Sequence, residues 1–157
     1  MKRLTIAMAV GSLVACGGSS SPTDPTSAPT TPANIAGSYN LSIGASSTCS
    51  AILPVETRVL NYVANVTQTG AAFNVQLLAK VIWNTALVTG TVSGNRVIFS
   101  TFSFSENDTG GGIALGTAGT ANVAADGSIT GTLNGTFQTP SGANCNIGNH
   151  QIHMVKR

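Results

Sequence analysis

Apolar and polar residues alternate with a period of two along the chain from Ile35 onward. The clearest example is the segment 73–84, which begins Phe-Asn-Val-Gln-Leu and has apolar side chains at every second position. Such alternation is typical of antiparallel strands that bury one face. No segment after residue 34 shows a convincing helical period of 3.6. The expected strands cover residues 39–43, 60–67, 73–84, 86–93, 96–105, 113–124, 129–137 and 145–155.

These segments predict an all-β domain of about eight strands, each reached from the previous one by a short turn. Ser93-Gly94-Asn95 and Asp126-Gly127 are typical turn sequences between such strands. A consecutive antiparallel series forms either an up-and-down barrel or a meander β-sandwich. We favour the barrel and keep the sandwich as the alternative.

The composition excludes several other classes of protein. The 157 residues make one folded domain the default. Charged residues are 8% of the chain, against about 25% in typical proteins, which excludes a coiled coil, a long charged helix and a basic nucleic-acid module. The 42% of hydrophobic residues argues against disorder throughout.

The N-terminus has the pattern of an export signal. Lys2 and Arg3 precede an apolar run over residues 4–15, which is too short for a permanent membrane-spanning helix. We therefore expect residues 1–15 to be a signal peptide. A short N-terminal helix is the alternative.

The end of this leader, Leu13-Val14-Ala15-Cys16, resembles the lipobox of secreted bacterial lipoproteins. The resemblance implies cleavage before Cys16, diacylglycerol on its sulfur and acylation of the new amino terminus. It also implies a lipid-anchored protein of the cell envelope. Gly17 stands where an Asp would resemble an inner-membrane retention signal, so the outer membrane is favoured if the organism has two. An ordinary signal peptide that happens to contain a Cys is the alternative.

Residues 16–34 would then form the lipidated Cys and a tether rich in Pro, Ser and Thr, and residues 35–157 the β-barrel domain. After cleavage, five basic and five acidic residues remain, so the mature chain has no net charge and no electrostatic case for binding nucleic acid. These residues are Arg58, Lys80, Arg96, Lys156 and Arg157, and Asp24, Glu56, Glu106, Asp108 and Asp126.

The cysteines favour the barrel over the sandwich. With Cys16 assigned to lipid, Cys49 and Cys145 remain as an even pair in an oxidising compartment. A disulfide between them would bring the first and last strands side by side, as closure of a meander requires. Two unrelated buried thiols are the alternative, and a zinc site is disfavoured because no C-x-x-C spacing occurs.

The opening Gly37-Ser38-Tyr39 resembles the Gly-x-Trp or Gly-x-Tyr element with which lipocalins and avidins begin. Other motifs of those families are missing, and the single Trp83 cannot supply the several aromatic walls of a biotin site. The chain is also similar to small bacterial lipoproteins with a Cys near both ends of a β-domain. The resemblance implies a shape and a location but no particular ligand.

A ligand pocket inside the barrel is one hypothesis. Its lining would include Tyr39, Trp83, Phe137 and His150. Small inward positions on the later strands could leave space there: Thr117, Gly119, Ala121, Gly131 and Gly135. An eight-stranded barrel is only just wide enough for its own side chains, however, so large side chains could fill that space.

Acidic and basic residues offer little catalytic chemistry. Glu56 and Arg58 could form a binding or catalytic pair, although an exposed ion pair on one face is the simpler interpretation. The turn with Glu106 and Asp108, followed by glycines 110–112, could hold Ca²⁺ weakly. It lacks the ligand spacing of a dedicated calcium loop, so a solvated hairpin loop is the preferred interpretation.

The two histidines do not suggest a catalytic or metal site. His150 and His153 are three apart on one strand and therefore face opposite sides, which favours a structural, hydrogen-bonded His150 over a metal ligand. No Gly-x-Ser-x-Gly motif and no carboxylate pair stands out. We therefore expect a protein that is not an enzyme and has no metal or cofactor.

Three functions from different classes remain. The favoured one is a monomeric envelope lipoprotein whose barrel has a structural or interaction role, contacting protein or glycan through a neutral exterior rich in Asn, Thr and Ser. The alternative is a carrier or receptor that holds a small apolar ligand inside the barrel. An enzyme with metal-assisted or acid/base chemistry has the least support.

Overall fold

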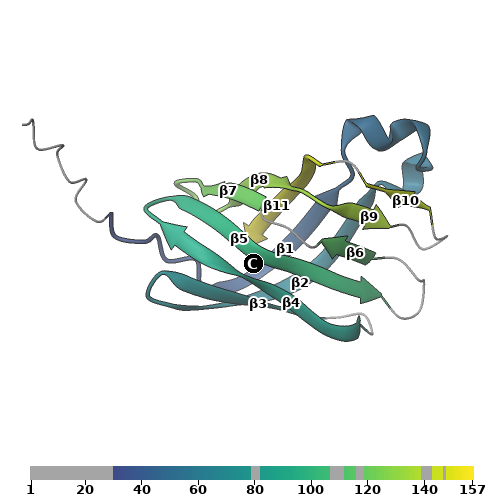
Figure 1. Cartoon of the computed structure of the whole chain (residues 1–157). Coiled ribbons are helices and arrows are strands. Elements are labelled where there is room, and N and C mark those ends of the chain that lie inside the picture. Colours follow the sequence, from purple (N-terminus) through teal and green to yellow (C-terminus); the bar gives the residue numbers. More distant parts are fainter. Residues whose placement is uncertain (1–29, 79–81, 107–111, 116–118, 139–142, 147) are drawn as a thin grey trace, which may run out of the picture.

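The computed structural model describes residues 30–78, 82–106, 112–115, 119–138, 143–146 and 148–157, with only the backbone described at 82–86, 104–106 and 112–115. The chain forms an all-β domain (Figure 1). Its elements are β1 (Gly37–Gly44), η1 (Ser47–Ala51), η2 (Val55–Thr57), β2 (Val59–Thr69), β3 (Ala72–Leu78), β4 (Ile82–Ser93), β5 (Arg96–Glu106), β6 (Gly112–Leu115), β7 (Gly119–Val123), β8 (Ile129–Leu133), β9 (Thr136–Gln138), β10 (Asn144–Cys145) and β11 (His150–Lys156).

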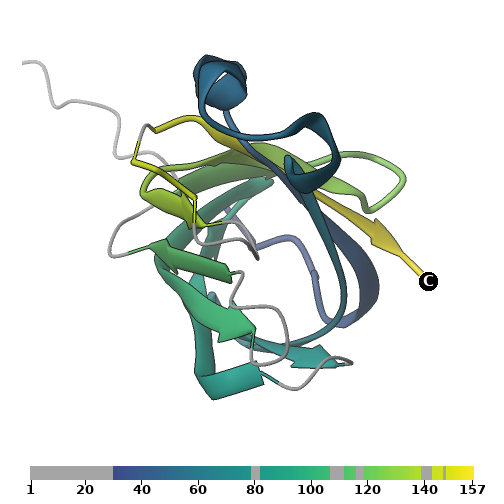
Figure 2. The same ribbon diagram turned by 90° about the vertical axis from the view of Figure 1, so that its right-hand side faces the viewer.

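Eight antiparallel strands close into a barrel. Each strand pairs with its neighbour in the ring β1-β2-β3-β4-β5-β7-β8-β11, and β11 returns to β1. The closing ladder runs from Tyr39 opposite Lys156 to Gly44 opposite Gln151. Viewed from one end, the strands surround a common axis (Figure 2). This closure confirms the expected up-and-down barrel and excludes the alternative sandwich.

Three short strands extend the barrel at one end. The first part of β5 pairs with β7, whereas its last part pairs with β6. On its other side β6 pairs with β9, and β9 pairs with β10. The strands expected at 113–124, 129–137 and 145–155 are therefore each divided in two. The strand expected at 73–84 is divided as well, because β3 ends at Leu78 and residues 82–84 belong to β4. The breaks have a local cause at two places, because Gly135 and Asn149 have φ angles of 142° and 68°, outside the extended region.

The two ends of the barrel differ. At one end, which we call the strap end, β1 begins and Gly37 lies opposite Val66 of β2. At the other end, which we call the cap end, Gly44 lies opposite Val59, and the segment with η1 and η2 connects β1 to β2. We use the term cap loop for residues 45–58. Figure 1 shows the described chain arriving at the end opposite this loop.

Residues 30–36, the N-terminal strap, lie across the strap end. The amide of Ala33 donates to the carbonyl of Gly94 at 2.8 Å. The amide of Ile35 donates to Gln68 Oε1 at 2.8 Å, and Gln68 Nε2 donates back to the carbonyl of Ala33 at 3.1 Å. Ile35 is buried in the core, and Ala33 just before it is hydrogen-bonded to the barrel.

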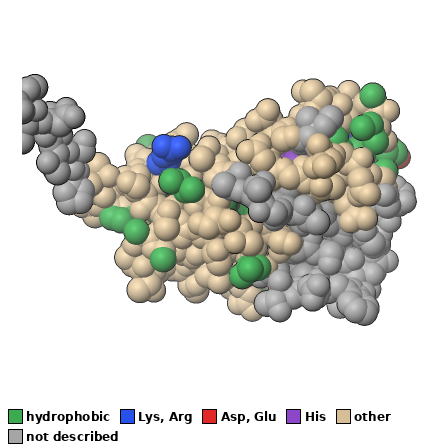
Figure 3. Space-filling model, viewed as in Figure 1, with side chains coloured by type: hydrophobic (Ala, Val, Ile, Leu, Met, Phe, Trp, Pro, Cys, Tyr) green, Lys and Arg blue, Asp and Glu red, His purple; other side chains and the backbone are tan. Residues whose placement is uncertain are grey.

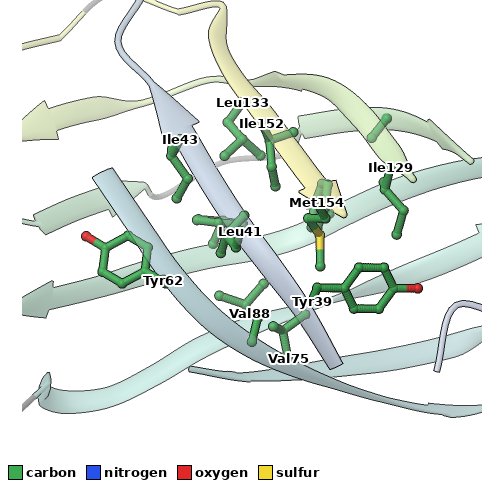
Figure 4. Close-up of a cluster of buried hydrophobic side chains, with 14 of the residues drawn as sticks. Tyr39, Leu41, Ile43, Tyr62, Val75, Val88, Ile129, Leu133, Ile152 and Met154 are labelled. Atoms are coloured by element: carbon green, nitrogen blue, oxygen red, sulfur yellow. The ribbon is translucent and has the colours of Figure 1, made fainter. Parts of the chain in front are cut away.

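Large apolar side chains pack on the described inner face of the barrel. The alternation places one face of each strand inward, and the inward side chains labelled in Figure 4 are at most 5% exposed. The labelled ones are Tyr39, Leu41, Ile43, Tyr62, Val75, Val88, Ile129, Leu133, Ile152 and Met154.

The small residues on β7 and β8 allow close packing. A β-carbon at Gly131 would overlap backbone atoms of Thr120 and Ala121 on the neighbouring strand. One at Gly119 would lie 2.5 Å from the side chain of Leu133. These glycines therefore do not open the space that the sequence suggested, and Thr117 lies outside the described residues.

Candidate functional site

Of the four residues expected to line a pocket, the three whose side chains are described do not lie together. Tyr39, Phe137 and His150 are all fully buried, but Tyr39 lies toward the strap end and the other two lie at the cap end. The hydroxyl of Tyr39 donates to the carbonyl of Ile35 at 2.9 Å, and burial raises its pKa. The side chain of Trp83 lies outside the described residues.

His150 is bound at both ring nitrogens. The amide of Ser46 donates to Nδ1 at 3.1 Å, and Nε2 lies 3.0 Å from the carbonyl oxygen of Gly135. Since a carbonyl can only accept, Nε2 must carry the proton in this neutral ring. The ring also packs against Phe137, with centroids 5.5 Å apart. Burial lowers the pKa of His150, and the Gly135 carbonyl opposes that shift.

The expected disulfide between Cys49 and Cys145 is present, with Cα atoms 5.8 Å apart. Its position differs from the expectation, because Cys49 lies in η1 and Cys145 in β10. The backbone ladder between β1 and β11 closes the barrel, and the disulfide attaches the cap loop to the strand that precedes β11.

Arg58 organises the cap loop from within. Its Nε donates to the carbonyl of Leu53 at 2.9 Å, and its Nη2 donates to the carbonyl of Ser50 at 2.8 Å. Leu53 itself is buried in the core. The described side chains include no ion pair between Glu56 and Arg58, so this exposed pair, favoured from the sequence, is not formed.

Apolar side chains are exposed around this loop. Ile52, Val55 and Val59 are 52%, 73% and 51% exposed. Figure 3 shows apolar side chains at the cap end, with smaller apolar groups scattered over the rest of the described surface. Exposed apolar groups that cluster on one loop are typical of a contact surface.

A shallow hollow of about 470 Å³ lies on the outer face of the barrel over β11, β1 and β2. Its outward-facing residues are Asn40, Ser42, Asn61, Val63, His153 and Val155. His153 is exposed and faces away from His150, as their spacing on one strand requires.

The remaining candidates give no metal site in the part of the chain that is described. Within residues 30–157 and outside the gaps given above, no group of three or more His, Cys, Asp or Glu side chains could hold a metal ion. The acidic turn of Glu106 and Asp108 and the lipobox Cys16 lie outside the described side chains. Among the described helices, none has both the length and the apolar character needed to cross a bilayer.

The sequence did not identify the partners of His150. Ser46 and Gly135 act through their backbone groups, and a backbone amide or carbonyl leaves no signal in residue type. The chain matches no protein-family model, no curated protein and no solved structure.

Proposed function

We propose that the protein is a lipoprotein of the cell envelope that displays a non-enzymatic barrel with a structural or interaction role at the membrane surface. The observation that carries this proposal is the packing of the described inner face of the barrel. Large apolar side chains occupy that face, which supports contacts with other molecules through the exterior. The described buried side-chain polar atoms all have hydrogen-bond partners, which supports a structural role for them rather than a catalytic one.

The arrangement of the two barrel ends suits a displayed domain. The tether expected at residues 16–34 would lead into the strap end, whereas the exposed apolar side chains of the cap loop lie at the opposite end. A tether of mixed Pro, Ser and Thr extends by about 3 Å per residue where it is polyproline-like. The cap loop would therefore be held away from the lipid and be available to another protein of the envelope.

The alternative of a carrier with an apolar ligand inside the barrel has less support. It requires empty space in the interior, and the described inner face is closely packed. The lipocalin-like outline of the barrel therefore supports a proposal about shape and not one about a ligand.

The anchor is tested with Cys16→Ser in cells that express the full chain. We expect the variant to incorporate no lipid label and to leave the membrane fraction, because several acyl chains are needed for stable anchoring. Ser21→Ala, a neutral change in the tether, is the control and should stay with the membrane. If Cys16→Ser resists high-salt and carbonate washes as the unchanged protein does, the lipoprotein proposal is wrong.

A further inference from the structure

Two attachments hold the cap loop to the last part of the chain. One is the covalent bond from Cys49 to Cys145. The other is the hydrogen bond from the amide of Ser46 to Nδ1 of His150, between residues 104 positions apart. Because both attachments start within four residues of each other on the same loop, they restrain the same movement.

The hydrogen bond exists only while the imidazole is neutral. Nδ1 accepts from Ser46, and Nε2 donates to Gly135. A protonated imidazolium carries a hydrogen on both nitrogens and accepts nothing. Protonation would place two donors face to face at Nδ1, while the bond from Nε2 to the Gly135 carbonyl would remain.

The groups that surround His150 give little compensation for a positive charge. The cap loop contributes Ser46, whose hydroxyl is hydrogen-bonded to the hydroxyl of Thr48, and β9 contributes the ring of Phe137. The carbonyl of Gly135 is the one described group that favours the cation. No described carboxylate, lysine or arginine perturbs the ring, and burial is the dominant effect.

We propose that His150 is an acid-sensitive latch on the cap loop. Protonation of His150 releases the amide of Ser46, and the cap end opens while the disulfide keeps the loop attached. The loop is thus controlled by two separate conditions, acidity through His150 and reduction through Cys49–Cys145. The proposal concerns the loop itself and holds whatever partner the exterior has.

Opening would change what the cap end presents to solvent. Leu53 of the cap loop and Phe137 beside His150 are both buried, and both would become accessible. The exposed side chains of Ile52 and Val55 lie on the same segment and would move with it. Acid would therefore alter the apolar surface at this end without requiring the barrel strands to separate.

Amide hydrogen exchange on the soluble full chain carrying Cys16→Ser tests the latch. Protection factors, corrected for intrinsic exchange, are measured between pH 7.5 and pH 4.5. We expect protection in the cap loop, including the amides of Ser46, Cys49 and Leu53, to fall by up to tenfold per pH unit once His150 begins to protonate. The amides shared by β2 and β3 should keep their protection over the same range.

Two variants separate the latch from other effects of acid. In His150→Asn, the amide oxygen can still accept from Ser46 but does not titrate, so loop protection should become independent of pH. His153→Asn removes the exposed histidine of the same strand and should keep the original pH dependence. Unchanged protection in the unmodified loop, or the same pH dependence in His150→Asn, would overturn the proposal.

A second measurement keeps the proposal testable if His150→Asn does not fold. In the unmodified barrel, nitrogen-15 resonances of the His150 ring and the amide resonance of Ser46 are followed through the same titration. We expect both to change with one midpoint. Different midpoints, or loss of all amide signals together, would mean that acid acts elsewhere or unfolds the whole barrel.

Discussion

Removal of the disulfide between Cys49 and Cys145 has an effect on stability that can be worked out from the fold. The bond joins residues 96 positions apart. In the unfolded chain it therefore closes a very long loop, and reduction returns the conformational entropy that this loop had lost. For a loop on the order of 100 residues, the chain-entropy model gives about 4.7 kcal/mol at 25 °C.

That free energy converts into a large shift of the melting temperature. A domain of this size loses roughly 3–6 °C for each kcal/mol, so reduction should lower Tm by roughly 14–28 °C. The slope of unfolding free energy against urea should also rise, because the released unfolded chain exposes more surface. The β1–β11 ladder does not include either cysteine, so the reduced protein should still contain the closed barrel.

The assay uses the full chain with Cys16→Ser, so that only the two relevant thiols remain. Melting is followed by far-ultraviolet circular dichroism in oxidised protein, reduced protein and the double variant Cys49→Ala/Cys145→Ala. The reduced protein and the double variant should agree within a few degrees. Two free thiols before reduction would refute the disulfide, and a loss of less than about 5 °C after complete reduction would refute the loop-closure reasoning.

Three further substitutions test the fold. Two of them have a matched control variant, and the third concerns the dependence of stability on pH. Gly90→Ala should cost about 1–3 kcal/mol because its β-carbon would overlap a backbone carbonyl and an aromatic ring. Gly44→Ala, with its nearest contact at 3.7 Å, should stay within about 0.5 kcal/mol. Arg58→Met should cost about 1–3 kcal/mol through two lost hydrogen bonds to carbonyls, whereas Arg96→Met should change little. Burial lowers the pKa of His150, so the unfolded chain takes up its proton first as the pH falls below 6.5. The free energy of unfolding should therefore decrease as the pH falls from 6.5 to the lower pKa of the folded state. His150→Asn should flatten this part of the plot of unfolding free energy against pH. All of these are measured by urea unfolding. Equal losses of stability in a variant and its control would contradict the packing and hydrogen-bond reasoning. A pH dependence in His150→Asn equal to that of the unchanged protein would contradict the role of His150.

The barrel could be predicted from the sequence because its signals are local and repeated. Alternation along a segment such as 60–67 fixes which side chains face inward, and short turns make consecutive strands neighbours. The pairing of Cys49 with Cys145 followed from counting cysteines. The divided strands were missed because the breaks depend on backbone angles at positions such as Gly135 and Asn149.

The cap end could not be predicted in the same way. Arg58 donates to two backbone carbonyls, and a sequence that places Glu56 nearby suggests an ion pair instead. His150 was recognised as a structural residue, but its acceptor role depends on the amide of Ser46 more than a hundred positions away. Contacts between a side chain and a distant backbone group have no period or spacing by which a sequence reveals them.

The pairing of β1 with β11 also sets the order in which the barrel can be completed. β1 has two neighbouring strands, and one of them is β11 at the C-terminal end of the barrel. β1 therefore gains this second neighbour only when the seven residues His150–Lys156 are present. A chain that emerges N-terminus first must therefore wait as an open sheet, with the backbone groups of β1 and β8 unpaired on their β11 sides. Loss of β11 alone would leave those two edges as templates for pairing between molecules, so the C-terminal residues protect the whole domain from aggregation.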